Sequence, residues 1–229
     1  MFGLSERLQL IASMVPDGAR VCDVGTDHGY LATALFKSGR VKSVIATDIK
    51  EKPLAHARES IKRLGAEGVD LRLCDGLEGL RNDEADTVIV AGMGGEVIAG
   101  ILSRAPWLKN DNITLILQPM TSAWELRRYL YKEGFEILKE PTLAENGKVY
   151  SVMLARYDGK EHSVDAFSCL VGKIENNTAS DREYLKKQYK RCNTCAVKLY
   201  GISGKEKEYE EYSLVAKEIK VMLGDTDGI

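Results

Sequence analysis

A glycine turn with two carboxylates follows the first apolar run of the chain. Residues 23–31 read Asp-Val-Gly-Thr-Asp-His-Gly-Tyr-Leu, so Asp23 and Asp27 flank Gly25. In open α/β folds, a glycine turn between a strand and a helix is where a nucleotide-like cofactor binds. Asp27 stands where a dinucleotide fingerprint has its second glycine, and its charge would repel a diphosphate at the helix N-terminus. The turn suits a ligand with an ammonium and a sulfonium instead, and S-adenosylmethionine is such a ligand.

Acidic residues also follow the next two predicted strands. Asp48 ends the second apolar run, and its two carboxylate oxygens suit the hydroxyl groups of a ribose. Asp75 and Gly76 follow the third run, where an acceptor suits the amino group of an adenine. Helix N-capping is the alternative role for Asp48 and Asp75. Carboxylates at three successive strand ends favour a ligand site over capping alone.

A glycine-rich tract and an amide end the fourth and fifth predicted strands. Residues 91–95 read Ala-Gly-Met-Gly-Gly, and the glycines leave the backbone bare for a close approach. Gln118 and Pro119 end the fifth strand, where the amide of Gln118 is placed to read a substrate edge. A tight turn with a helix cap is the alternative for the glycines.

The elements that must position these residues alternate along the chain. The predicted strands cover residues 20–24, 43–48, 69–73, 87–91, 113–117, 135–138 and 149–154. Most are apolar on both faces, as in strands covered by helices on each side, so the fold class is a doubly wound α/β domain. The last two strands are predicted to form an edge hairpin through residues 145–148. Boundary signals predict helices from Pro53 to Gly65 and from a capping box at 122–125 to a stop before Gly134.

Only helical patterns follow. Apolar stripes predict a short helix and two long helices in an antiparallel hairpin, so the chain divides into a cofactor-binding domain over 1–157 and a helical extension over 158–229. A capping box at residues 180–183 is predicted to open the first long helix. Basic residues gather on that helix, and another group follows the fifth strand. The alternative for the helix is pairing with glutamates of its neighbour, among them Glu206 and Glu210.

The charge balance limits the classes of partner. With 32 Lys+Arg and 34 Asp+Glu in 229 residues, the formal net charge is −2, so any RNA contact must rest on a local basic patch. No apolar run is long enough to span a membrane and no secretion signal is visible, so a soluble, cytoplasmic protein is expected. The five cysteines are expected to be reduced, and Cys192 and Cys195 lack a second pair at zinc spacing. No metal, membrane or obligate protein partner is expected.

Three motifs resemble the bacterial tRNA (adenine-22-N1)-methyltransferase family, TrmK. They are residues 23–31, residues 90–96 (Val-Ala-Gly-Met-Gly-Gly-Glu) and residues 117–119 (Leu-Gln-Pro), followed by a helical extension that is the least similar part. The resemblance implies a Rossmann-like class I methyltransferase fold with a seven-stranded sheet and a coiled-coil-like hairpin. It also implies S-adenosylmethionine as donor and N1 of adenine 22 of tRNA as acceptor. The cofactor-site residues expected from it are Arg7, Leu8, Asp23, Gly25, Asp27, His28, Asp48, Ile49, Asp75, Gly76, Ala91, Gly92 and Met93.

Methylation of adenine N1 requires alignment more than a strong base, because N1 has a free lone pair once the base is unpaired. N1 lies on the Watson–Crick edge, so the base must leave its stack. The expected catalytic residues are Asp27, His28 and Gln118, with Asp27 or His28 accepting a hydrogen bond from the amino group. The expected substrate contacts are Gly94, Gly95, Gln118, Pro119, Arg127, Lys186, Lys187 and Lys190. His56 and His162 show no acidic neighbour at useful spacing and are predicted to be surface residues.

Other functions stay open on the residues alone. A methyltransferase of this fold acting on another RNA position, a protein or a small metabolite would carry the same carboxylates, because they serve the donor. A donor-binding or RNA-binding protein without turnover is disfavoured by the complete acidic set. An NAD-dependent oxidoreductase is disfavoured by Asp27 in the turn.

Overall fold

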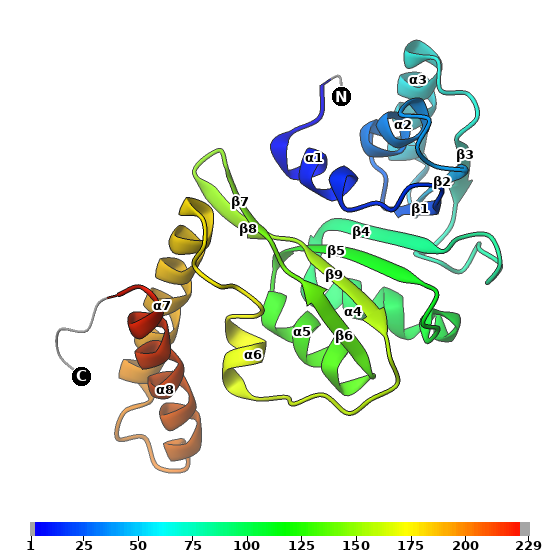
Figure 1. The fold of residues 1–229 in the computed structure, drawn as a ribbon. Helices are drawn as coiled ribbons and strands as arrows, with labels where there is room; N and C mark the ends of the chain where they lie inside the picture. The colour runs from blue at the N-terminus through cyan, green and yellow to red at the C-terminus, as the bar shows by residue number, and fades with distance from the viewer. Residues whose placement is uncertain (1–2, 225–229) are drawn as a thin grey trace.

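The computed structural model describes residues 3–224. Its centre is a seven-stranded sheet in the order β3-β2-β1-β4-β5-β9-β6, in which β9 runs antiparallel to both its neighbours (Figure 1). The strands are β1 (Arg20–Val24), β2 (Ser43–Asp48), β3 (Asp70–Leu73), β4 (Thr87–Gly94), β5 (Thr114–Thr121), β6 (Phe135–Lys139) and β9 (Met153–Tyr157). The doubly wound, mostly parallel fold class predicted from the alternating runs is confirmed.

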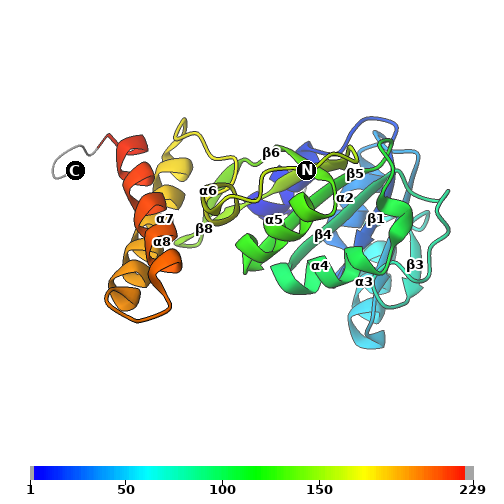
Figure 2. The ribbon, with the colours of Figure 1, turned by 90° about the horizontal axis from the view of Figure 1, so that it is seen from below.

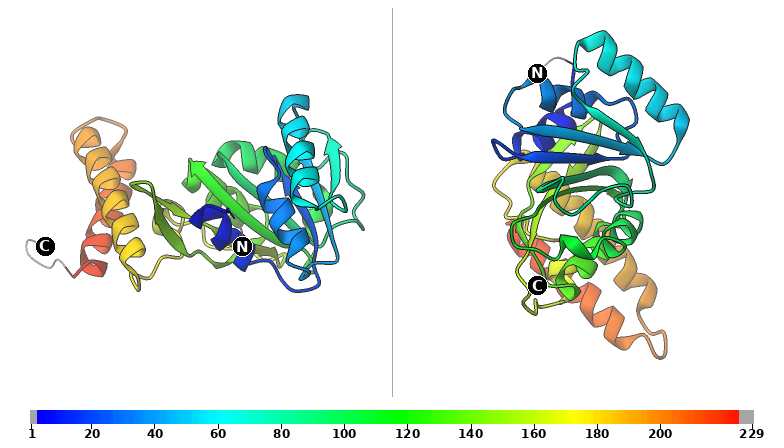
Figure 3. Two further views of the ribbon diagram at one scale, coloured as in Figure 1. Left: turned by 90° about the horizontal axis from the view of Figure 1, so that it is seen from above. Right: turned by 90° about the vertical axis from the view of Figure 1, so that its right-hand side faces the viewer.

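Helices cover both faces of this sheet, as the right-hand view of Figure 3 shows. Alternate strand residues face opposite layers: Val21 packs with one apolar core cluster and Cys22 with the other. Burial on both faces explains why the strands read as continuous apolar runs. One layer consists of α1 (Glu6–Ser13), α2 (Tyr30–Lys37) and α3 (Glu51–Leu64), and the other of α4 (Gly95–Ser103), the 3-10 turn η1 (Pro106–Leu108) and α5 (Ala123–Lys132).

The prediction that the last two strands form an edge hairpin through residues 145–148 is wrong, because this turn joins a different pair of strands. The turn at Asn146 and Gly147 joins two strands of a separate two-stranded sheet, β7 (Thr142–Glu145) and β8 (Lys148–Ser151). Both turn residues have positive φ, +51° and +69°, so this two-residue Asn-Gly turn pairs the residues that flank it directly. The strand predicted over 149–154 is therefore divided at Val152, and β9 alone joins the main sheet.

The helix boundaries are confirmed more often than the predicted caps. α3 ends at Gly65, which has φ +65°, and α5 ends before Gly134. Ser122, however, has φ +52° and makes no capping hydrogen bond to α5. The capping box of α7 (Ala179–Leu199) lies two residues earlier than predicted, with the Thr178 hydroxyl accepting from the Asp181 N–H and the Asp181 carboxylate accepting from the Thr178 N–H.

The helical extension stands at one end of the molecule, next to the β7–β8 sheet (Figure 2). It contains α6 (Ala166–Leu170) and the antiparallel hairpin of α7 and α8 (Glu206–Met222), as predicted. Its own apolar core includes Leu185, Cys192, Val215 and Ile219. None of the helices built from residues 3–224 is long and apolar enough to cross a membrane.

Candidate active site

Two cavities lie at the carboxyl ends of the central strands and share Asp27 in their linings. The larger, of about 480 Å³, contains Gly25, Asp27, Asp48, Ile49, Asp75, Gly76 and Met93 among its lining residues. The smaller, of about 240 Å³, is lined in part by Arg7, Leu8, Asp23, Asp27, His28, Ala91 and Gly92. The structure therefore brings every residue expected at the cofactor site into these two cavities, which share Asp27 and together form the donor cleft. Parallel strands explain this, because their carboxyl ends meet at one edge of the sheet.

The larger cavity has two anchored carboxylates. Asp48 accepts hydrogen bonds from the backbone N–H groups of Lys50 (2.9 Å) and Asp27 (3.3 Å), which fix its position at the end of β2. Asp75 accepts a hydrogen bond from Arg104 Nη2 at 3.0 Å. Arg104 was not expected from the sequence, because it lies on the turn after α4, far along the chain from Asp75. The cavity thus offers carboxylate oxygens to hydroxyl and amino donors.

The smaller cavity contains a buried carboxyl group, Asp23, whose pKa is raised. Asp23 is 4% exposed, and the Thr26 hydroxyl donates to its Oδ2 at 2.7 Å. Burial is the main reason that the pKa of Asp23 rises from 3.8 to about 6; the Thr26 hydrogen bond lowers it, and the charge of Asp48 raises it again. A cation reaching Asp23 would offset that burial cost, so the site favours a positively charged ligand group.

Gly25 is required by both conformation and space. Its φ is +71°, and a Cβ at this position would lie 2.1 Å from Met93 Cε. Met93 therefore lies directly over the glycine turn. Asp27 also has positive φ, +52°, which Asp tolerates better than most residues, and its side chain is 69% exposed at the mouth of the two cavities.

His28 forms the aromatic rim of the smaller cavity. Its ring stacks with those of Tyr30 and His56, at centroid distances of 5.5 Å and 5.2 Å. His56 is thus not an isolated surface residue, although nothing in its sequence neighbourhood indicated the stack. The expectation for His162 was also wrong, since its Nε2 lies 2.8 Å from the carboxylate of Asp158, four residues earlier.

Gln118 does not present its amide to a substrate. The side chain is 0% exposed, and its Oε1 accepts hydrogen bonds from Arg7 Nη1 (2.7 Å) and the Gly92 N–H (3.2 Å). Its Nε2 donates to the Pro119 carbonyl. The expectation that Gln118 reads the acceptor base is therefore wrong: it joins α1 to the glycine tract and positions both. The Arg7 N–H in turn donates to Glu145 of β7.

The glycine tract divides into two parts with different roles. Gly92 and Gly94 are partly or fully exposed, whereas Gly95 is buried. A Cβ on Gly95 would lie 2.2 Å from the Ser122 carbonyl oxygen. Gly95 is thus needed because the segment before α5 packs closely against it. The expectation that Gly95 contacts the substrate is wrong. Pro119 is also buried, at the edge of a third cavity beside α7.

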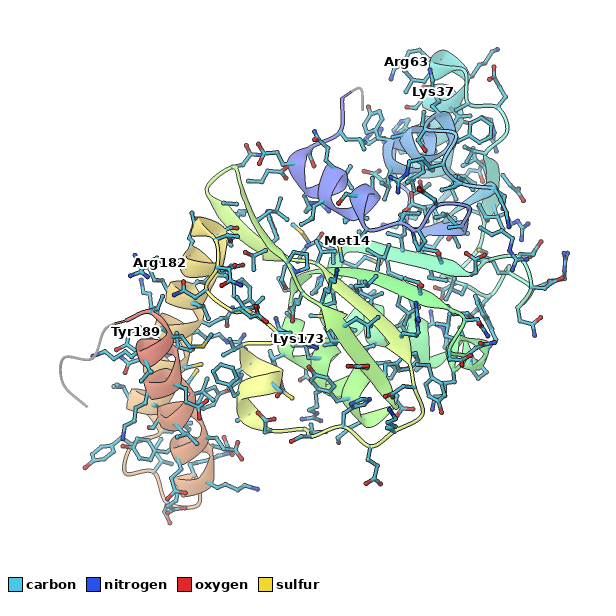
Figure 4. All side chains as sticks on the ribbon, viewed as in Figure 1. Met14, Lys37, Arg63, Lys173, Arg182 and Tyr189 are labelled. Carbon is cyan, nitrogen blue, oxygen red and sulfur yellow. The ribbon has the colours of Figure 1, made fainter. Side chains whose placement is uncertain are left out.

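Arg127 was expected to contact tRNA, but the structure buries it. It is 0% exposed and donates to Glu140, to the Cys169 carbonyl and to the Tyr184 hydroxyl. Burial lowers its pKa, but the charge of Glu140 and the interaction with Tyr184 more than offset this, so the pKa is raised and the guanidinium stays charged. The segment with Lys173, labelled in Figure 4, closes this junction through its N–H to Glu140 (3.0 Å). Arg127 therefore joins the sheet domain to the extension and does not contact RNA.

The three lysines expected at a tRNA contact are exposed on α7. Among residues 3–224, no ion pair joins a basic residue of α7 to a glutamate of α8; the pairs there are Lys205–Glu208 and Lys207–Glu211. The alternative that the basic residues of α7 pair with the glutamates of α8 is thus not supported by the structure. All five cysteines are free thiols. Among residues 3–224, no group of three or more His, Cys, Asp or Glu side chains is arranged to hold a metal ion.

Fold and site define a Rossmann-like methyltransferase. Residues 4–153 match the family described as "Methyltransferase domain". The chain is 35% identical over 172 residues to the tRNA (adenine(22)-N(1))-methyltransferase of Bacillus subtilis, covering 75% of this chain and 72% of that protein. The chain belongs to this methyltransferase family.

Solved structures extend the similarity to the whole chain. The structure of the B. subtilis m1A22 tRNA methyltransferase TrmK is 28% identical, with a TM-score of 0.79, and the match covers 99% of this chain and 100% of that one. A Streptococcus pneumoniae protein in complex with S-adenosyl-L-methionine is 30% identical, with a TM-score of 0.80, over 96% of this chain and 100% of that one. These structural matches include the helical extension, whereas the match to the methyltransferase-domain family ends at residue 153.

Proposed function

We propose that this protein transfers a methyl group from S-adenosylmethionine to N1 of adenine 22 of tRNA. The single observation that carries the donor assignment is the cleft in which all the expected cofactor residues meet around buried Asp23. The family relationship supports the acceptor. Because tRNA is the substrate, the protein acts in the cytoplasm, with no need of a membrane or a metal ion.

The residues present fit the donor by chemistry. S-adenosylmethionine, when bound, supplies an electrophilic methyl group on a cationic sulfur. Asp23 and Thr26 would hold its ammonium group, since Asp23 is the buried carboxylate with a raised pKa. Asp48 would accept from the ribose hydroxyls, and Asp75, held by Arg104, would accept from the adenine amino group. Arg7, placed by Gln118 beside Gly92, suits the carboxylate of the amino-acid part.

The acceptor side needs alignment and an environment that tolerates positive charge. Adenine N1 would use its own lone pair to form the N–C bond while the methyl–sulfur bond breaks and neutral S-adenosylhomocysteine leaves, so the purine gains the positive charge and its amino group becomes more acidic. Asp27 and His28 lie at the cavity mouth, where an exposed carboxylate stabilises a nearby cation and accepts a hydrogen bond from the amino group. Gly92 and Gly94 leave open backbone there. Lys186, Lys187 and Lys190 are the proposed phosphate contacts on α7.

The test is methylation of defined transcripts. Unmodified tRNA with adenine at position 22 is incubated with labelled S-adenosylmethionine, and the product is mapped by reverse transcription, which stops at N1-methyladenine because the Watson–Crick edge is blocked. We expect label and a stop at position 22, and neither with guanine at that position. Asp23→Asn, for which we expect a donor affinity lowered about 10- to 100-fold, serves as the control enzyme and should transfer less label at subsaturating donor. Label at another nucleotide, or no transfer to RNA, would refute the assigned acceptor.

A further inference from the structure

A third cavity separates the sheet domain from the helical extension. It encloses about 260 Å³ between the end of β5, strand β8 and helix α7. We call it the interdomain groove and define it by Met120, Thr121, Tyr150, Lys187, Gln188 and Arg191. None of these six residues lines the two cavities of the donor cleft. The groove is therefore a separate site in the same molecule.

Gln188 in this groove has an unmet hydrogen-bonding group. The residue is 7% exposed, and its side-chain oxygen is buried without a partner. Only one other buried side-chain atom of the described residues, Thr33 Oγ1, is in this state. A buried amide oxygen without a partner destabilises a fold, and Gln188 lines the groove, so a rotation of the side chain that turns the amide into the groove would let a ligand complete it.

The other groove residues supply complementary chemistry. Lys187 and Arg191 lie one turn apart on α7, are exposed, and take part in none of the ion pairs found within residues 3–224. Tyr150 is half-buried on β8, and Met120 is 40% exposed at the end of β5. Cations for a phosphate, an aromatic face for stacking and an amide for a base edge together match an unpaired ribonucleotide.

The groove lies next to the acceptor side of the donor cleft. Thr121 lines the groove and pairs with Gly94 of the glycine tract in the β4–β5 register. A strand of RNA whose target base enters the cleft would thus reach the groove with a neighbouring nucleotide. By contrast, Lys186 and Lys190 are on α7 but do not line the groove.

We propose that the interdomain groove binds a nucleotide next to the target adenine, in a substrate RNA. Lys187 and Arg191 contact its phosphate, Tyr150 stacks on its base, and the Gln188 amide bonds to the base edge. The proposal rests on the function proposed above and deepens it, because it places sequence recognition at the junction of the two domains rather than along the whole helical hairpin.

The first test compares two double variants with equal loss of charge. Lys187→Ala/Arg191→Ala removes the groove cations, and Lys198→Ala/Lys217→Ala removes two exposed lysines elsewhere on the hairpin. With unmodified tRNA transcript and saturating S-adenosylhomocysteine, we expect the groove variant to raise the dissociation constant about tenfold and to reduce the slope of log K against log salt by about 0.7–0.9, as for one phosphate contact. The control variant should change both much less. Equal effects in the two variants would overturn the groove assignment.

The second test separates a ligand-serving amide from a structural one. Gln188→Met keeps the side-chain length and removes both polar atoms. If the amide serves RNA, the melting temperature stays the same or rises, because an unpaired polar group is removed, while the dissociation constant for tRNA rises about three- to tenfold. A lowered melting temperature with unchanged RNA binding would overturn the proposal.

The proposed function and the groove assignment predict different failures. If wild type methylates adenine 22 but the groove variants behave like the control, the proposed function stands and the groove assignment falls. If wild type neither binds nor methylates the transcript, the proposed function falls and takes the groove with it. Retained binding of S-adenosylhomocysteine by every variant, measured by calorimetry, shows that the donor cleft is folded in each case.

Discussion

Asp23 and Glu140 are both 4% exposed, yet the two carboxylates have opposite surroundings. Glu140 pairs with the guanidinium of Arg127 at 2.6 Å and accepts the Lys173 N–H at 3.0 Å. Within residues 3–224, Asp23 forms no ion pair, and its closest recorded partner is the neutral hydroxyl of Thr26. One buried charge is matched from inside the chain and the other is not.

The difference separates a structural site from a binding site. A buried ion pair with its remaining hydrogen bonds made costs the fold little, whereas a buried charge without a counter-charge destabilises it. Asp23 lies at the end of the first strand in the donor cleft, where a cationic ligand group supplies the missing charge. Glu140 lies at the junction of the two domains, where the charge of Arg127 already does so. Removing each charge should therefore change stability in opposite directions.

Arg127→Met gives the largest expected effect. It leaves Glu140 buried without its cation and removes the hydrogen bonds to the Cys169 carbonyl and the Tyr184 hydroxyl. We expect the free energy of unfolding to fall by about 3–5 kcal/mol, measured by urea denaturation. The double variant Arg127→Met/Glu140→Leu should recover most of that loss, because no unpaired charge remains.

Arg128 provides the matched control for this variant. It is the next residue of α5, is exposed, and stacks over the Trp124 ring at 5.9 Å. Arg128→Met removes the same group and should lower stability only slightly. If Arg127→Met and Arg128→Met were equally stable, the junction would not depend on the buried pair. Glu140 would then not be a structural carboxylate that contrasts with Asp23.

Asp23→Asn should instead stabilise the protein at neutral pH. Because the folded-state pKa is raised to about 6 from 3.8, the wild-type protein loses stability as the pH rises through that interval, and the Asn variant does not. We expect the variant to be more stable by up to about 3 kcal/mol at pH 7.5 and nearly equal to wild type at pH 4, by urea denaturation. Its affinity for S-adenosylhomocysteine should fall about 10- to 100-fold.

The two readouts must move in opposite directions for the interpretation to hold. A variant that loses both stability and ligand affinity would show that Asp23 supports the fold rather than the ligand. Asp86 supplies a control carboxylate at the opposite end of the sheet, where it already pairs with Arg20 at 3.2 Å. Asp86→Asn should leave ligand affinity unchanged.

The donor half of the site was predictable from the sequence because strand ends converge. Once β1, β2 and β4 are recognised as parallel neighbours, Asp23, Asp48 and the glycine tract must lie together, whatever the details of packing. Strand positions were recognisable because burial on both faces gives continuous apolar runs. β7 gave no such signal, since Thr142–Glu145 alternates without a buried face. Only the Asn-Gly turn beside it indicated a tight hairpin.

The domain junction was not predictable because its contacts are distant in sequence. Arg127 is one of two neighbouring arginines on a helix, but it meets Glu140 from the segment after β6 and Tyr184 from α7. A signal was present: Arg127 falls between Leu126 and Leu130 on the buried stripe of α5, where an arginine needs an internal partner. Gln118 was misread for a related reason, since its partner Arg7 lies near the N-terminus.

Gly25→Ala gives the smallest expected change in stability and tests whether the glycine turn contacts the donor. Alanine at φ +71° is strained, and its Cβ would require the Met93 methyl to move. We expect a loss of about 1–2 kcal/mol in the free energy of unfolding and a rise of at least about tenfold in the dissociation constant of S-adenosylhomocysteine, measured by calorimetry.

Gly39→Ala separates the two causes. Gly39 has a similar φ of +65°, but no atom lies within 4 Å of a Cβ built there, so its replacement carries backbone strain without crowding. The two variants should lose similar stability, and only Gly25→Ala should lose ligand affinity. Equal affinity in both would mean that the glycine turn is not in contact with the donor. Asp23 would then have to bind its cation without the backbone approach that Gly25 allows, and the cleft would accept a smaller ligand than S-adenosylmethionine.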